Sequence, residues 1–87
     1  MASIEEVKAA LAQAADQGNT TLNQIQAATN SIDQMLTRLR AVSAGTNHAK
    51  IAEAMSRAEQ SKQRLAEAAT LIQGSSAAAR EYVAVLG

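Results

Sequence analysis

Apolar side chains recur along most of this chain at alternating spacings of four and three residues, and this pattern constrains the fold more than any other feature. Spacing of this kind puts every member of a run on one side of an α-helix, as in the seam of a coiled coil. The sequence therefore predicts two long helices that pack along their seams. The predicted core and dimer-packing residues are Leu11, Leu22, Ile25, Ile32, Leu36, Leu39, Ile51, Met55, Leu65, Ile72, Val83 and Leu86.

The pattern is interrupted at Ser43-Ala44-Gly45-Thr46-Asn47. Gly45 suits the left-handed conformation that ends many helices, and Thr46 or Asn47 can cap the helix that follows. We expect one domain over residues 1–87, with a helix over 4–43, a turn over 44–47 and a helix over 48–86. Because a short turn makes consecutive helices antiparallel neighbours, the predicted fold class is all-α, a two-helix antiparallel hairpin.

Two glycine-containing stretches lie inside the predicted helices. Gly18 is unfavourable in a helix interior, but the seam keeps its phase on both sides of it. We therefore expect a continuous first helix with a close approach at Gly18, rather than a kink. Gly74-Ser75-Ser76 is a candidate break in the second helix. At the chain start, Ser3 with Glu6 three residues later is a capping box.

The apolar stripes are wider than a two-stranded seam requires. A lone hairpin would leave its outer edges in water, with Met35, Val42, Leu71 and Val85 on them. The chain has 87 residues and no cysteine, so neither a large core nor disulfides can offset this. We expect association with another hairpin, most simply a homodimer that forms an antiparallel four-helix bundle, or else a heterodimer with a similar hairpin.

Charge and motif content weigh against several classes of function. Eight acidic residues balance eight basic ones, which does not favour binding to nucleic acid or to anionic membranes. The sequence contains no run of about 18 apolar residues, which a membrane-spanning helix would need. Its acidic N-terminus does not resemble a signal peptide. The expected location is the cytoplasm, or outside the cell by a route independent of a signal peptide.

No arrangement of residues in the sequence predicts a catalytic, metal or cofactor site. The carboxylates are spread along both helices without Glu-x-x-His repeats, and His48 stands alone beside the turn. We expect no catalytic, metal or cofactor site, no small-molecule substrate, and an exposed His48 without a role. The chain is therefore predicted not to be an enzyme.

A few polar and aromatic residues remain candidates for partner recognition. Tyr82, the sole aromatic residue, either packs against Ile4 and Val7 or is an exposed recognition group, and we favour packing. Arg38 and Arg40 lie near the turn, where basic residues outnumber acidic ones. We favour a solvated face there over contact with nucleic acid or an acidic partner. Lys62 falls within the second seam, where its stem can lie along the apolar stripe while its ammonium stays in water.

A small, cysteine-free hairpin of two helices of about 40 residues, rich in alanine and glutamine, resembles the W-x-G family of type VII (ESX) secretion substrates. It is most similar to the tryptophan-lacking hairpins of actinobacteria. The turn keeps the family's glycine as Gly45 without its tryptophan, and Leu86 follows Tyr82 where the family's export signal has an acid.

The resemblance implies a bundle of two hairpins that acts by interaction. We expect an ESX-like secretion substrate or partner; the alternative is a cytoplasmic structural or regulatory coiled-coil protein that binds nucleic acid weakly.

Overall fold

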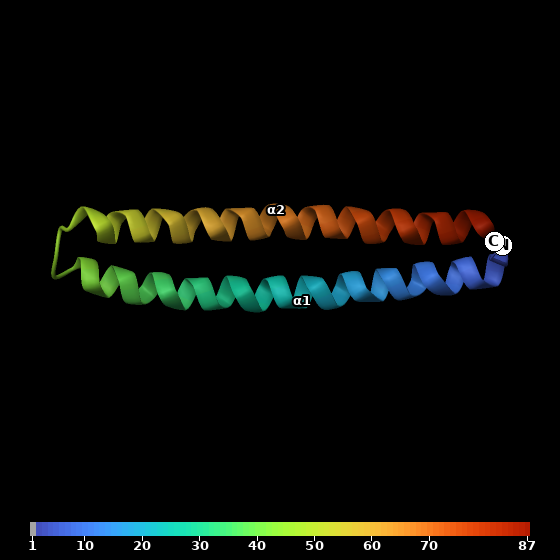
Figure 1. Ribbon diagram of the computed structural model, residues 1–87, viewed down its shortest axis with the longest axis horizontal. Helices are drawn as coiled ribbons and strands as arrows, with labels where there is room; N and C mark the ends of the chain where they lie inside the picture. The colour runs from blue at the N-terminus through green and yellow to red at the C-terminus, as the bar shows by residue number, and fades with distance from the viewer. Residues whose placement is uncertain (1) are drawn as a thin grey trace. The chain divides into compact units, whose positions relative to one another are not determined.

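The chain folds as two long helices. The computed structural model describes residues 2–87, in which α1 spans Ile4–Ser43 and α2 spans Ala49–Leu86, with no strand among these residues (Figure 1). The two helices pack against each other, so the predicted all-α helical hairpin is confirmed.

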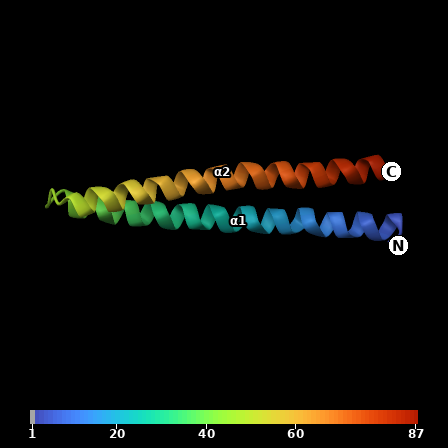
Figure 2. The same ribbon diagram turned by 45° about the horizontal axis from the view of Figure 1, so that its top comes forward.

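Contacts between α1 and α2 divide the chain into two compact units. Unit 1 combines residues 1–24 with residues 68–87, and unit 2 is the continuous segment Ile25–Glu67. Within each unit a stretch of α1 lies beside an antiparallel stretch of α2 (Figures 1 and 2). Unit 2 contains the loop between the helices, and unit 1 contains the start of α1 and the end of α2.

The start of α1 follows the predicted cap. The Ser3 hydroxyl accepts a hydrogen bond from the Glu6 N–H at 3.1 Å, and the Ser3 carbonyl accepts from the Val7 N–H at 3.0 Å. Glu5 and Glu6 occupy the first turn, where negative charge is favoured by the helix dipole.

The end of α1 differs from the prediction. Gly45 does not take the left-handed conformation; among residues 2–87 a positive φ occurs only at Gly87. The last carbonyls are instead satisfied within tight turns: Gly45 N–H donates to the Val42 oxygen at 3.0 Å, and the Ser43 hydroxyl donates to the Arg40 oxygen at 2.9 Å. Because these bonds already satisfy the helix end, no left-handed residue is needed.

The cap of α2 is His48, and the prediction of Thr46 or Asn47 is wrong. His48 Nδ1 accepts the Lys50 N–H at 3.1 Å, while the His48 carbonyl accepts the Ile51 N–H at 3.0 Å. These are the two bonds of an N-cap residue, so the helix begins at Ala49, one residue later than expected. Thr46 supports the cap, since its hydroxyl accepts the His48 N–H at 3.3 Å.

Both helices run without interruption through their glycines. α1 is continuous at Gly18 and α2 is continuous at residues 74–76, so the candidate break there is absent. In unit 1 a Cβ at Gly18 would overlap the Oγ of Ser76, which is 5% exposed. Gly18 therefore marks the close approach of α1 and α2 that the sequence predicts, whereas nothing lies within 4 Å of the equivalent Cβ position at Gly74.

The core formed by the seams is thin. Among the described residues the buried apolar side chains are Ala15, Leu36 and Ala58, and Leu36, at 1% exposed, is the largest. The other predicted core residues are half-buried: Leu11, Leu22, Ile25, Ile32, Leu39, Ile51, Met55, Leu65, Ile72, Val83 and Leu86. The predicted seams thus face the helix contact, but two helices alone do not remove most of their side chains from water.

Candidate interaction surface

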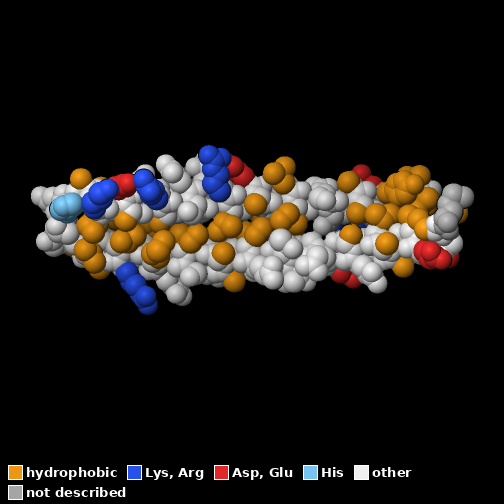
Figure 3. Space-filling model, in the orientation of Figure 1, with side chains coloured by type: hydrophobic (Ala, Val, Ile, Leu, Met, Phe, Trp, Pro, Cys, Tyr) orange, Lys and Arg blue, Asp and Glu red, His pale blue; other side chains and the backbone are white. Residues whose placement is uncertain are grey.

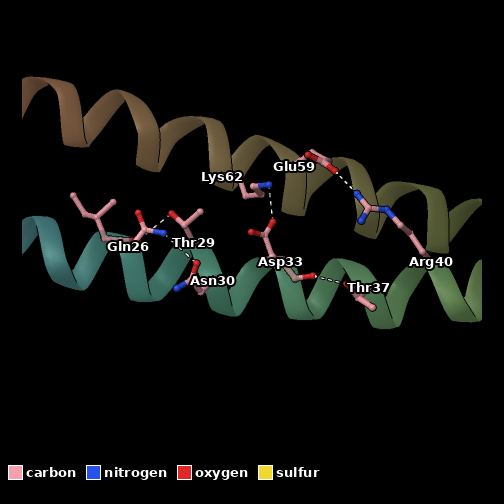
Figure 4. Close-up of polar contacts among 9 residues, drawn as sticks. Gln26, Thr29, Asn30, Asp33, Thr37, Arg40, Glu59 and Lys62 are labelled. Atoms are coloured by element: carbon pink, nitrogen blue, oxygen red, sulfur yellow. Dashed lines mark hydrogen bonds and ion pairs between the residues drawn. The ribbon is translucent and has the colours of Figure 1, made fainter.

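Two ion pairs join α1 to α2 in unit 2. The Lys62 ammonium lies 2.6 Å from a carboxylate oxygen of Asp33, and the Arg40 guanidinium lies 2.9 Å from a carboxylate oxygen of Glu59 (Figure 4). Both pairs are partly exposed, so each stabilises the fold only modestly. They show which residues of the two helices face each other in this unit.

Lys62 differs in detail from the prediction. Its ammonium binds Asp33 on the facing helix instead of remaining in water alone. The hydrogen bond that the Lys62 ammonium donates to the Asp33 carboxylate, followed by the attraction of that negative charge, raises the pKa of Lys62 above its ordinary value of 10.5.

Most other polar side chains near these pairs bond locally within α1. The hydroxyls of Thr29 and Thr37 donate to carbonyls four residues earlier, at 2.9 and 3.0 Å. Gln26 donates its side-chain amide to Asn30 at 3.1 Å (Figure 4). These side chains satisfy one another along the helix, so they do not form a site that converges on a ligand.

The basic residues of unit 2 differ in their partners. Lys50 and Arg57 both form ion pairs with Glu53, at 3.0 and 2.7 Å. The Glu53–Arg57 pair has the i,i+4 spacing that is typical of ion pairs on helices. Arg64 pairs with Glu67 at 3.2 Å. Arg38, one of the two predicted recognition arginines, makes no ion pair with any described residue, whereas Arg40 is held by Glu59.

Basic and apolar residues share one face of unit 2. We define the unit-2 mixed face as six exposed residues that lie beside the two seams: Met35, Arg38, Val42, Lys50, Arg57 and Arg64. Four of them are basic and two are apolar. Met35 is 46% exposed and Val42 is 50% exposed, and basic side chains project beside hydrophobic ones in this part of Figure 3.

Unit 1 also has exposed apolar residues beside its seams. We define the unit-1 apolar face by six of them, Ala10, Ala14, Leu71, Ala78, Tyr82 and Val85, whereas Glu6 and Gln17 occupy equivalent positions of α1. Leu71 is 74% exposed and Val85 is 81% exposed, and hydrophobic side chains gather near the end of α2 in Figure 3. The prediction that Met35, Val42, Leu71 and Val85 remain in water is confirmed for the hairpin.

Tyr82 belongs to this apolar face. The sequence favoured a Tyr82 ring packed against Ile4 and Val7, but the residue is only partly buried. Tyr82 is 51% exposed, and Ile4, one of its expected partners, is 56% exposed. About half of the tyrosine is thus available to another molecule.

A groove of about 170 Å³ lies elsewhere in unit 1. It is lined by Leu11, Ala12, Ala15, Asp16, Arg80 and Val83. Cavities that hold metabolites are commonly about 300–1,000 Å³, so this groove suits a single side chain better than a small-molecule substrate.

Residues 2–87 include no group of three His, Cys, Asp or Glu side chains placed to hold a metal ion. Neither described helix has the long apolar stretch that crossing a bilayer requires. In comparisons of the chain with protein-family models, curated proteins and solved structures, nothing matched significantly.

Two structural roles were missed by sequence reasoning. The capping role of His48 had a weak signal, because histidine is not among the preferred N-cap residues. The partner of Lys62 could be found only from the register of the two helices, which brings Asp33 opposite it.

Proposed function

We propose that this chain is a non-enzymatic helical interaction module that works by pairing with another helical hairpin. The observation that carries the proposal is the uncovered apolar stripe beside a thin seam. Leu36 is the one large side chain that is fully buried among the described residues, whereas Leu71 and Val85 are 74% and 81% exposed. Contiguous exposed apolar surface on a small protein is typical of an interaction site.

The energetics of long helices support pairing. Most of the stability of a helix in a protein comes from packing of its apolar face, and here alanine and half-buried residues supply much of that packing. A second hairpin laid on the stripe would cover it and complete a four-helix bundle.

A dilution series measures this directly. Mass from light scattering and helicity from circular dichroism should show either a dimer, with a melting temperature that rises with concentration, or a poorly helical monomer that gains helix with a partner hairpin. A fully helical monomer whose melting temperature does not depend on concentration would refute the proposal.

The biological role that we propose for the module is that of an ESX-like secretion substrate or partner. Support comes from the hairpin itself, with helices of 40 and 38 residues, from Gly45 in the loop, and from the half-exposed Tyr82 in the last turns of α2. In an actinobacterial host, the chain should reach the medium only when the type VII system works. Tyr82→Ala should reduce export while Tyr82→Phe retains it, and equal export from a host without the system would rule this role out.

A cytoplasmic coiled-coil protein with weak nucleic-acid binding is the second candidate. It is favoured by Arg38, which has no ion-pair partner among the described residues, but Arg40, Lys50 and Arg57 each pair with a glutamate. Retention on a DNA column at low salt that is lost with Arg38→Gln would support it, because phosphate contacts are strongly salt-dependent. Absence of retention at low salt would remove it.

A further inference from the structure

We propose that Ser43 is a phosphorylation site for an arginine-directed serine kinase, which recognises Arg38 and Arg40 and takes a nucleoside triphosphate as its second substrate. The three residues lie in the stretch Arg38-Leu39-Arg40-Ala41-Val42-Ser43, at the end of α1 in unit 2. This inference goes beyond the proposed function, and it does not depend on a partner hairpin.

The spacing of the two arginines singles out Ser43. Arg40 is three residues before it and Arg38 is five residues before it, and no other serine or threonine of the chain follows a basic residue by three positions. Kinases select their substrates by charge pattern, and carboxylates in a substrate cleft bind arginine through paired, charge-assisted hydrogen bonds. Ser43 is therefore the hydroxyl that such a kinase would select.

The position of Ser43 gives its hydroxyl access to an active site. Ser43 is the last residue of α1, directly before the loop, and it is half-buried. The three residues before it, Arg40, Ala41 and Val42, are all exposed. A helix end that buries few apolar contacts opens at low cost, so the last turn of α1 can unwind locally.

Unwinding also brings the two arginines to one side of the chain. Residues two apart differ in direction by about 200° on a helix, so Arg38 and Arg40 diverge in α1. Arg40 contacts Glu59 of α2, whereas Arg38 has no ion-pair partner among the described residues. In an extended chain, residues two apart project from the same side. Both arginines then face the same wall of a kinase cleft.

The reaction is a phosphoryl transfer. The Ser43 Oγ attacks the terminal phosphorus of the nucleoside triphosphate and forms the new O–P bond, while the bond from that phosphorus to the bridging oxygen breaks. The nucleoside diphosphate leaves with the electron pair of the broken bond, and the hydroxyl proton passes to a carboxylate of the kinase. The product is a phosphoserine that carries a charge of about −1.5 to −2 at pH 7.

The phosphate acts on contacts at the end of α1. The Ser43 hydroxyl donates to the Arg40 oxygen at 2.9 Å, and the phosphate ester has lost that proton. Its negative charge lies at the C-terminal end of a helix, where the helix dipole disfavours it. The phosphate also competes with Glu59 for the Arg40 guanidinium, which is held in one of the two ion pairs between the helices of unit 2 (Figure 4). Phosphorylation therefore loosens the end of α1 beside the loop.

The site is tested with the full chain, the catalytic domain of an arginine-directed serine kinase and magnesium ATP. Intact mass and peptide mapping should show a phosphate on Ser43, and Ser43→Ala should abolish its incorporation. Ser56→Ala is the matched control, because Ser56 is an exposed serine of unit 2 with Glu53 three residues before it. Absence of incorporation, or phosphate on Ser56 instead of Ser43, would overturn the proposal.

Recognition by the arginines is tested with variants that remove one charge. Arg38→Gln and Arg40→Gln should each lower kcat/KM for phosphorylation about tenfold or more, because each removes a charge-assisted pair with the kinase. Arg64→Gln, at an exposed arginine of α2, should leave kcat/KM within about twofold. Arg40→Gln also frees the end of α1 from Glu59, so a residue that only holds the helix closed would give faster phosphorylation when it is replaced. A faster rate for Arg40→Gln would thus overturn its role in recognition.

The structural effect is read from thermal melting at one protein concentration. The phosphorylated chain should melt about 4–8 °C below the unmodified chain. Ser43→Ala loses the hydroxyl hydrogen bond without gaining charge, so it should melt closer to the unmodified chain. In a Glu59→Gln background Arg40 has already lost its carboxylate partner, and the phosphate should lower the melting temperature less. A phosphorylated chain that melts at or above the temperature of the unmodified chain would overturn the loosening of α1.

Discussion

The two interior glycines should respond oppositely to the same substitution. Gly74 lies in the middle of α2 with nothing near its Cβ position, so Gly74→Ala should stabilise the protein by about 0.5–1 kcal/mol through helix propensity. Gly18→Ala gains the same propensity, but its Cβ would overlap the Oγ of the buried Ser76. Overpacking of this kind commonly costs about 1–3 kcal/mol. Gly18→Ala should therefore be less stable than Gly74→Ala by about that amount.

Thermal melting followed by circular dichroism is a suitable assay. For a chain of this size, a change of 1 kcal/mol shifts the melting temperature by about 4–8 °C, so the two variants should be clearly separated. All samples must be compared at one concentration, with light scattering to confirm the same assembly state.

Ser76→Ala provides the control for the mechanism. It removes the Oγ and leaves the Ser76 Cβ at 3.6 Å and the Ile72 Cγ2 at 3.8 Å from the new methyl, which are ordinary contacts. The Gly18→Ala, Ser76→Ala double variant should recover most of the lost stability, as a coupling energy of about 1–3 kcal/mol in a double-mutant cycle. Equal melting temperatures for Gly18→Ala and Gly74→Ala would refute the close approach as the reason for Gly18.

Three further predictions concern the core, the cap and the ion pair. Leu36→Ala should lower the free energy of unfolding by about 2–4 kcal/mol because Leu36 is 1% exposed, and Ile4→Ala, at a residue 56% exposed, should cost much less in the same denaturant titration. His48→Ala should lower the melting temperature by an amount equivalent to about 0.5–1 kcal/mol through loss of the N-cap, while His48→Asn should not, and equal losses would contradict the capping role. Because the pKa of Lys62 is raised in the folded chain, the stability that its pair with Asp33 contributes should be complete below pH 10.5 and be lost as the pH rises through the raised value. The gap in melting temperature between the natural chain and Lys62→Met should therefore narrow above pH 10.5, and a gap that does not change with pH would count against the pair.

The helices and their contact face could be predicted because they follow from periodicity. The run from Leu11 to Leu39 and the run from Ile51 to Leu86 each repeat at helical spacing, and a short turn between them leaves little choice of topology. The exposed stripe was predictable for the same reason, since Leu71 and Val85 fall outside the seam.

The details that could not be predicted depend on geometry across several residues. Whether Gly45 adopts the left-handed backbone conformation depends on which N–H groups donate to the last carbonyls of α1. Here the N–H groups of the tight turns donate to them. The cap by His48 depends on the placement of its ring nitrogen, which sequence patterns do not encode. The pair of Lys62 with Asp33 depends on which turns of α1 and α2 lie opposite each other, and the repeating spacing of the seams does not define that register.

The start of α1 and the end of α2 belong to the same compact unit. A cargo domain joined to either end of the hairpin would therefore be tethered to unit 1, and the loop in unit 2 would remain free. Because the loop belongs to unit 2, a tag inserted in the loop and a cargo joined at a terminus would be attached to different compact units of the chain.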